Sequence, residues 1–182
     1  MIQEKRELKL YFNTKELSTI ITFSAIGAII SVPIGYLGNY LKTIPLLPIG
    51  TGQVLAGLHL IMITITALRL RKTGTATITG IVKGLVEAVL FSFHGLPVIA
   101  MSGIQGAIID IMLKVFGYES KIGLILGCGL SALSNVLFIQ FFLAMPFPLN
   151  VYAIMYTLSF ISGVFLGAYP AKQLDQMIKA RI

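Results

Sequence analysis

The sequence carries very little charge. Only 12% of its 182 residues are Asp, Glu, Lys or Arg, which is about half the share found in an ordinary soluble domain. The stretch 122–171 contains none of these four residue types. A soluble domain needs a charged surface and cannot sustain such a run. The composition therefore excludes a soluble enzyme, a nucleic-acid-binding domain and a disordered tail, and it indicates an integral membrane protein.

Cysteine and the common catalytic motifs are also scarce. The chain has one cysteine, Cys128, and no tryptophan, so it has no disulfide framework. It contains no G-x-x-x-x-G-K-S/T phosphate-binding loop, no H-E-x-x-H motif and no Cys/His cluster with metal-ligand spacing. Neither ATP hydrolysis by such a loop nor a metal enzyme is indicated. We predict that the chain is not an enzyme and needs no cofactor.

Hydrophobic residues, at 56% of the chain, fall into runs long enough to cross a bilayer, which takes about 20 residues. Charges, turns and prolines divide these runs into six segments. Their expected bounds are 17–41, 45–68, 73–93, 97–116, 122–145 and 149–169. Pro33 is expected to bend the first helix or end it early, and Pro170 to break the last. The predicted fold class is an all-α membrane protein with a bundle of six transmembrane helices.

The basic residues predict the orientation. Twelve of the fourteen lie on one side of the predicted topology: Lys5, Arg6, Lys9, Lys15, Arg69, Arg71, Lys72, Lys114, Lys121, Lys172, Lys179 and Arg181. Because basic residues concentrate on the cytoplasmic side, both termini are expected in the cytoplasm. The net charge of +7 then reflects topology and does not call for nucleic acid.

The expected domain organisation has three parts. Residues 1–16 form a cytoplasmic or interfacial amino-terminal segment, residues 17–172 the transmembrane domain, and residues 173–182 a cytoplasmic tail. The first segment has charges of both signs and does not read as a removable signal. Residues 8–12 form either a short amphipathic piece at the interface or part of a frayed tail.

Small residues recur four positions apart on nearly every segment, as at Gly80 and Gly84. Such stripes let helix backbones approach closely in lipid, and most are expected to pack inside the bundle. A stripe that faced lipid would instead dock another membrane protein, and Ser24 and Ala28 on the first helix are the candidates. No internal repeat relates two halves of the chain, which argues against a self-sufficient alternating-access transporter.

Polar side chains inside the predicted spans are expected to have a structural or functional role, because inserting a charged side chain at the bilayer centre costs at least about 2.5 kcal/mol. Most of them fall between the midplane and the outer surface in the predicted topology. This distribution predicts a substrate cavity open to the outside. Its candidate residues are Glu87, Gln105, His94, Asn135, His59, Gln53, Tyr156 and Phe91.

Glu87 is the leading candidate, because a buried carboxylate can accept two hydrogen bonds from an amino-substituted heterocycle or pair with a ligand cation. The alternative is that it only neutralises Lys83, one turn away. Lys83 is expected to pair with Glu87 or Asp110, and Asp110 can also pair with Lys114, four residues on. Structural and functional roles for Lys83 and Asp110 both stay open at this stage.

Two stretches of the chain resemble the substrate-binding (S) components of energy-coupling-factor (ECF) vitamin transporters. The first runs from Arg71-Lys72-Thr73-Gly74 into Leu85-Val86-Glu87, and the second joins His94-Gly95-Leu96-Pro97 to Gln105-Gly106. The most similar group is the YkoE-like permeases, assigned to thiamine or its hydroxymethylpyrimidine precursor. That group has an acid after the Q-G pair, and here it is Asp110 where Glu is expected.

The resemblance implies a mechanism and a set of partners. S components of this kind bind a vitamin at the outer face of a prokaryotic plasma membrane and associate with a transmembrane coupling subunit and two ATPases. The family contacts its coupling subunit through a small-xxx-small motif on helix one, which corresponds here to Ser24 and Ala28. Metal-type S components use an amino-terminal Met-x-His on the outside. This chain begins Met1-Ile2-Gln3, which argues against nickel or cobalt.

Two other functions remain open on the sequence alone. The chain could be a small membrane assembly or scaffold protein whose polar groups only hold helices together. It could also be an autonomous ion-coupled carrier of small molecules that uses Glu87, Lys83 and Asp110.

Overall fold

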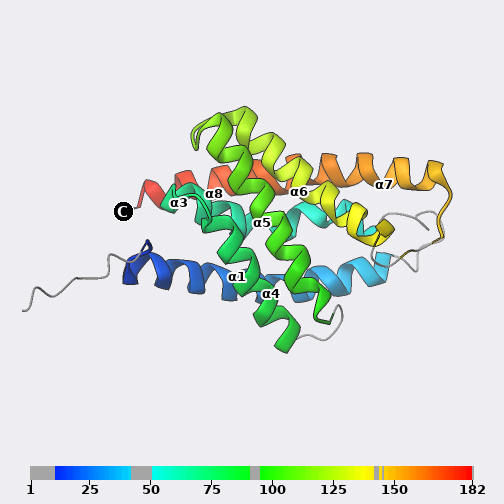
Figure 1. The fold of residues 1–182 in the computed structure, drawn as a ribbon, viewed down its shortest axis with the longest axis horizontal. Coiled ribbons are helices and arrows are strands. Elements are labelled where there is room, and N and C mark those ends of the chain that lie inside the picture. The colour runs from blue at the N-terminus through cyan, green and yellow to red at the C-terminus, as the bar shows by residue number, and fades with distance from the viewer. Residues whose placement is uncertain (1–10, 42–50, 91–94, 142–143, 145, 182) are drawn as a thin grey trace, which may run out of the picture.

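The structure is a computed structural model that describes residues 11–41, 51–90, 95–141, 144 and 146–181, and every regular element in them is helical (Figure 1). The elements are α1 (Thr14–Leu41), α2 (Thr51–Val54), η1 (Ala56–Leu60), α3 (Ile61–Leu70), α4 (Thr75–Leu90), α5 (Pro97–Phe116), α6 (Lys121–Phe141), α7 (Leu149–Ser162), η2 (Gly163–Ala168) and α8 (Tyr169–Lys179). The predicted all-α class is confirmed.

Four helical stretches in the described part are long and apolar enough to cross a membrane. They are Thr14–Leu41, Pro97–Phe116, Lys121–Phe141 and Leu149–Lys179. They correspond to the first, fourth, fifth and sixth segments predicted from the sequence. The second segment is a shorter apolar stretch, Ala56–Leu70, preceded by α2, and the third is α4, with 16 residues.

Helix α1 begins at a reciprocal capping pair. The Asn13 backbone N–H donates to Glu16 Oε2 at 2.8 Å, and the Glu16 N–H donates to Asn13 Oδ1 at 2.9 Å, which satisfies backbone groups that the first turn leaves free. The same Glu16 oxygen accepts Lys72 Nζ at 2.8 Å. Arg71 in turn pairs with Glu119 at 2.9 Å. These ion pairs join the start of α1, the α3–α4 turn and the α5–α6 turn at one end of the molecule.

Pro33 lies inside α1, which continues to Leu41. Of the two alternatives expected at this proline, a bend or an early end, the early end is therefore wrong. A proline leaves one carbonyl of the preceding turn without its donor, but neighbouring helices and hydroxyl side chains make such a position tolerable in a membrane helix. Ser31, two residues earlier, donates its hydroxyl back to the Gly27 carbonyl at 3.0 Å.

The break predicted at Pro170 is also wrong. The last helix widens into a π-helical segment, Gly163–Ala168, and continues through Pro170 as α8. The Tyr169 N–H bonds to the Val164 carbonyl, five residues back, and a widened turn of this kind accommodates a proline that lacks an N–H. The predicted tail from residue 173 is thus helical up to Lys179. Asp175 is buried on α8 and pairs with Lys179.

Helices α4 and α5 lie side by side, and α4 packs across α1 (Figure 1). Glycines bring their backbones together: a Cβ added at Gly80 would lie 2.1 Å from the Ser102 carbonyl oxygen, and one at Gly106 would lie 2.2 Å from that of Ala76. The small-residue stripe of α4 therefore packs inside the bundle, as predicted. The apolar core around this contact includes Leu60, Ile63, Ile109, Leu113, Cys128 and Ala132.

Candidate substrate-binding site

Lys83 and Glu87 form a buried ion pair on α4. Lys83 Nζ donates to Glu87 Oε2 at 2.6 Å, and the two side chains are only 2% and 7% exposed. Of the partners that the sequence allowed for Lys83, the structure selects Glu87. The second carboxylate oxygen, Oε1, makes no hydrogen bond with any residue that the structure describes. It remains available as an acceptor.

The stem of Lys83 packs where α1, α3 and α4 meet. A Cβ added at Gly27 would lie 3.4 Å from Lys83 Cδ and 3.1 Å from Met62 Cβ. One helical turn further along α1, Ser31 Oγ lies 2.9 Å from His59 Nδ1. His59 is half-buried and tied to α1 by this contact, so its ring is fixed against the helix that also covers Lys83.

Gln53 and Gln105 carry side-chain amides that are almost completely enclosed. They are 5% and 4% exposed, and Asn135 is half-buried. In the described part of the chain, the buried side-chain atoms without a hydrogen-bond partner are Thr75 Oγ1, Tyr118 Oη and Asp175 Oδ1. No amide atom of Gln53, Gln105 or Asn135 is therefore both fully buried and unpaired. An amide can donate and accept hydrogen bonds, so these side chains can serve a ligand that reaches them.

A side-chain-to-backbone hydrogen bond fixes the backbone at or beside Gln105 and Gln53. Ser131 of α6 donates to the backbone oxygen of Gln105 at 3.0 Å, and Asn135 follows one turn later on α6. Ser162 of α7 donates to the backbone oxygen of Val54, next to Gln53, at 2.6 Å. Gln105 and Asn135 therefore lie near the same contact between α5 and α6, whereas Gln53 lies at a separate contact between α2 and α7.

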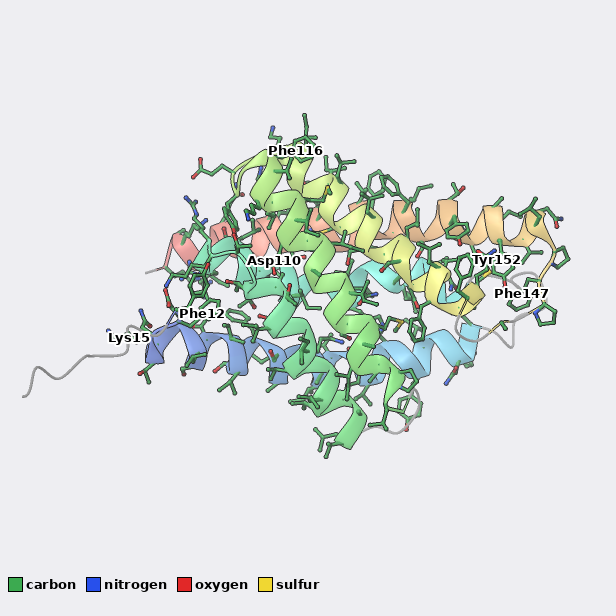
Figure 2. All side chains as sticks on the ribbon, in the orientation of Figure 1. Phe12, Lys15, Asp110, Phe116, Phe147 and Tyr152 are labelled. Carbon is green, nitrogen blue, oxygen red and sulfur yellow. The ribbon has the colours of Figure 1, made fainter. Side chains whose placement is uncertain are left out.

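Tyr156 belongs to a small apolar cluster between α6 and α7, with Val136, Val151, Tyr152 and Met155. Its hydroxyl donates to Gln140 Oε1. The Phe147 and Tyr152 rings meet edge to face with centroids 5.8 Å apart. Figure 2 shows both at the end of the molecule opposite Lys15. Tyr156 thus has a protein partner already and lies among apolar side chains.

Asp110 does not belong to this group. Its carboxylate accepts the backbone N–H groups of Ala76 (3.1 Å) and Thr77 (2.8 Å) and the Thr77 hydroxyl (2.6 Å), so it caps the start of α4 from α5. Figure 2 shows it in the half of the molecule that contains Phe12 and Lys15. Burial raises the pKa of Tyr118 in the adjoining α5–α6 turn, and the nearby Asp110 charge adds to this effect.

The pairing of Asp110 with Lys114 that the sequence suggested is wrong. Lys114 is exposed, and in the described part of the chain the Asp110 oxygens are taken by α4. Two further predicted site residues, His94 and Phe91, lie outside the described residues.

Ser24 and Ala28 face the interior of the protein. Both have no exposed surface, and Ser24 donates its hydroxyl to the Thr79 backbone oxygen on α4 at 3.0 Å. The expectation that this stripe faces outward as a docking surface is wrong. Its small side chains serve the contact between α1 and α4.

A comparison with known families decides what kind of protein carries this site. The family described as the permease component of the ABC-type cobalt transport system matches residues 15–135, which is more than half of the chain. The chain belongs to this permease family. Its fold is similar to that of the solved structure titled "Crystal structure of an S-component of ECF transporter", with a TM-score of 0.82 and 21% identity over 93% of this chain and 87% of that chain. No curated protein matches the sequence.

Membership of a permease family agrees with a multi-pass membrane transport protein rather than an enzyme. The S-component resemblance seen in the sequence is supported at the level of the fold. The family description names cobalt, whereas the amino-terminal sequence Met1-Ile2-Gln3 led us to expect that the ligand is neither nickel nor cobalt. Among the residues that the structure describes, no group of three or more His, Cys, Asp or Glu side chains could hold a metal ion.

The permease also has an apolar groove, between α4 and α5. It measures about 570 Å³ and is lined by Ile81, Leu96, Ile99, Ala100, Gly103, Ile104 and Ala107. No candidate site residue lines this groove, so it is not the polar cavity that the sequence predicted. The predicted site list also omitted Gln140, the partner of Tyr156, although both were recognisable as polar residues in apolar segments.

Proposed function

We propose that this permease is the substrate-capture subunit of an ATP-driven ECF-type importer. The observation that carries the proposal is the fold of an S component in a chain of a permease family. The nearly buried polar side chains of Glu87, Gln53 and Gln105 support it, because a capture subunit needs hydrogen-bonding groups that can hold its ligand.

The proposed topology has six membrane crossings, with α2–η1–α3 as the second and α4 as the third. The cations of the described part support cytoplasmic termini, because most lie at the start of α1, in or beside the α3–α4 and α5–α6 turns, and on α8. In Figure 1 the start of α1 and the end of α8 lie at the same end of the molecule. The membrane would be the plasma membrane of a prokaryote.

The proposed partners are a transmembrane coupling subunit and two ATPase subunits. The chain itself has no phosphate-binding loop, so energy from ATP has to come from other subunits. It also lacks an internal repeat, which many self-sufficient carriers possess.

The proposed ligand is a small water-soluble vitamin or precursor, with thiamine or hydroxymethylpyrimidine as the leading choice. Amides at Gln53, Gln105 and Asn135 can donate and accept hydrogen bonds at the edge of an aminopyrimidine, and Glu87 Oε1 can accept from its amino group. Cobalt is the second candidate, because the family description names it.

Replacing Glu87 with glutamine is expected to weaken binding of hydroxymethylpyrimidine by about 10- to 100-fold, since a hydrogen bond to a charged group contributes about 1.5–3 kcal/mol. Isothermal titration of the purified protein without ATP measures this effect. Lys114→Gln, at an exposed position far from the candidate residues, is the control and should bind normally.

This titration, repeated with other ligands and variants, and a transport assay in liposomes separate the candidate functions and ligands. Normal binding by Glu87→Gln would remove Glu87 from the site. Binding of Co²⁺ but of neither pyrimidine would favour the metal. Binding of no vitamin and no metal, together with tolerance of Gln105 and Gln53 substitutions, would favour the scaffold alternative. Transport by the chain alone in liposomes would favour an autonomous carrier.

A further inference from the structure

The last helix is longer than a bilayer requires. α7, η2 and α8 form one helical run, Leu149–Lys179, of 31 residues, which measures about 45 Å at about 1.5 Å per residue. The hydrocarbon core of a bilayer is about 30 Å thick, and a tilt of about 20°, the average for membrane helices, shortens the run by only about 3 Å. α7 begins at the end of the molecule opposite the C-terminus (Figure 1). α8 therefore extends from the hydrocarbon into the headgroup region of one membrane surface.

One side of this run changes from apolar to polar as it reaches that surface. Phe165 and Tyr169 lie four residues apart and are 67% and 64% exposed. From Tyr169, helical spacings of three, four and seven place Lys172, Gln173 and Gln176 on the same side. We call these five residues the interfacial face. Phenylalanine suits the acyl chains, tyrosine the membrane–water boundary, and the long polar side chains the headgroups.

The interfacial face is positively charged. Asp175 is the acid of α8, and it lies on the buried side of the helix, 4% exposed, where Lys179 pairs with its Oδ2. Its Oδ1 is buried without a hydrogen-bond partner. In the described part of the chain, Lys172 and Arg181, which follows α8, form no ion pair. The positive charge of Lys172 is thus not compensated by an acid of its own helix.

The other acids at this end of the described chain already have partners. Glu16 and Glu119 each pair with a basic side chain of the α3–α4 turn, and Asp110 binds the start of α4. A cation at a membrane surface attracts anionic lipid headgroups, and a phosphate group forms strong, charge-assisted hydrogen bonds with a lysine. An anionic phospholipid supplies this charge together with an acyl chain for the apolar part of the same face.

We propose that the interfacial face binds an anionic phospholipid, with Lys172 at the phosphodiester group, Tyr169 at the level of the glycerol and Phe165 against an acyl chain. Arg181 adds to the attraction from the end of the chain. This lipid site is separate from the candidate substrate site and does not depend on the proposed ligand. With cytoplasmic termini, the bound lipid belongs to the inner leaflet.

The absence of tryptophan from the chain allows a direct test, because a single introduced tryptophan reports only on its own surroundings. Tyr169→Trp places the probe on the interfacial face and keeps an aromatic ring at the interface. The purified full chain is reconstituted in phosphatidylcholine vesicles that contain a small fraction of brominated phosphatidylglycerol or brominated phosphatidylcholine, which quench the fluorescence on contact. The anionic lipid should bind at least about fivefold more tightly, the effect of one cation near the membrane surface. The preference should fall toward one in about 1 M NaCl.

Charge variants of the probe protein locate the site. Lys172→Gln should remove most of the preference, and the further change Arg181→Gln should remove the remainder. Lys114→Gln, which deletes an exposed cation near the end of α5, is the matched control and should leave the preference unchanged. In the chain that keeps Tyr169, Leu149→Trp places the probe at the start of α7, 81% exposed, at an end of the described chain without cations, and it should show no preference.

Equal quenching by the two lipids would overturn the proposal. A preference that Lys172→Gln leaves unchanged would also overturn it, because the protein end as a whole would then attract the lipid. Loss of the preference on adding inorganic phosphate, at an ionic strength matched with NaCl, would show an anion site instead of a lipid site. If Tyr169→Trp does not fold, Phe165→Trp carries the probe one turn deeper. Substrate binding by Lys172→Gln should be normal, so failure of the lipid site and failure of the proposed function are distinguishable.

Discussion

Replacing Asp110 with alanine is expected to lower the free energy of unfolding by at least about 2 kcal/mol, because the loss of a helix cap costs about 0.5–2 kcal/mol and a buried donor left unpaired about 1–3 kcal/mol. The carboxylate accepts the N–H groups of Ala76 and Thr77 and the Thr77 hydroxyl. The first N–H groups of a helix have no partner within the helix. A negative charge at this position also interacts favourably with the positive end of the helix dipole. Without Asp110, the buried Ala76 N–H and the partly buried Thr77 N–H would lose their acceptor.

Denaturant titration of the purified protein in detergent measures this loss. Asp110→Asn keeps one oxygen acceptor and should fall between the alanine variant and the unmodified chain. Lys114→Ala, which removes the partner suggested by the local i,i+4 spacing, should change stability by no more than about 0.5 kcal/mol, as usual for an exposed side chain. Equal effects of Asp110→Ala and Lys114→Ala would contradict the capping role.

The Asp110 result marks a limit of prediction from sequence. Local spacing correctly indicated the Lys83–Glu87 pair, because its two residues lie four apart on one helix and share a face. The partner of Asp110 is 33 residues away on another helix, and no local pattern shows which helix ends meet. All-α class and close small-residue contacts were predictable, because both follow from composition and local periodicity.

The candidate site, too, could be predicted from the sequence only in part. Burial of Gln53 and Gln105 follows from placing polar groups within apolar segments, which must turn them away from lipid. The orientation of Ser24 and Ala28 did not follow, because a membrane helix is apolar on its protein face and on its lipid face alike, and periodicity cannot tell the two apart. Continuation of the last helix through Pro170 depends on a widened turn whose formation is set by packing against neighbouring helices.

A methyl group at Gly106 is expected to destabilise the protein by about 3 kcal/mol or more, at or above the upper end of the usual cost of overpacking. The added Cβ would lie 2.2 Å from the Ala76 carbonyl oxygen and 2.8 Å from Thr77 Cα. These neighbours are backbone atoms, which cannot move aside as a flexible side chain does. Gly35→Ala is the matched control, because a Cβ there meets nothing within 4 Å, and it should stabilise α1 by up to about 1 kcal/mol.

Combining Gly106→Ala with Gly80→Ala tests whether both glycines serve the same contact. A Cβ at Gly80 would lie 2.1 Å from the Ser102 carbonyl oxygen, on the same interface between α4 and α5. Once one methyl has pushed the helices apart, the second meets a partly opened gap, so the double variant should cost less than the sum of the single variants. Denaturant titrations of the four proteins measure this coupling. Additive losses would show that the two positions respond independently, and α4 and α5 would then not behave as one rigid, closely packed pair.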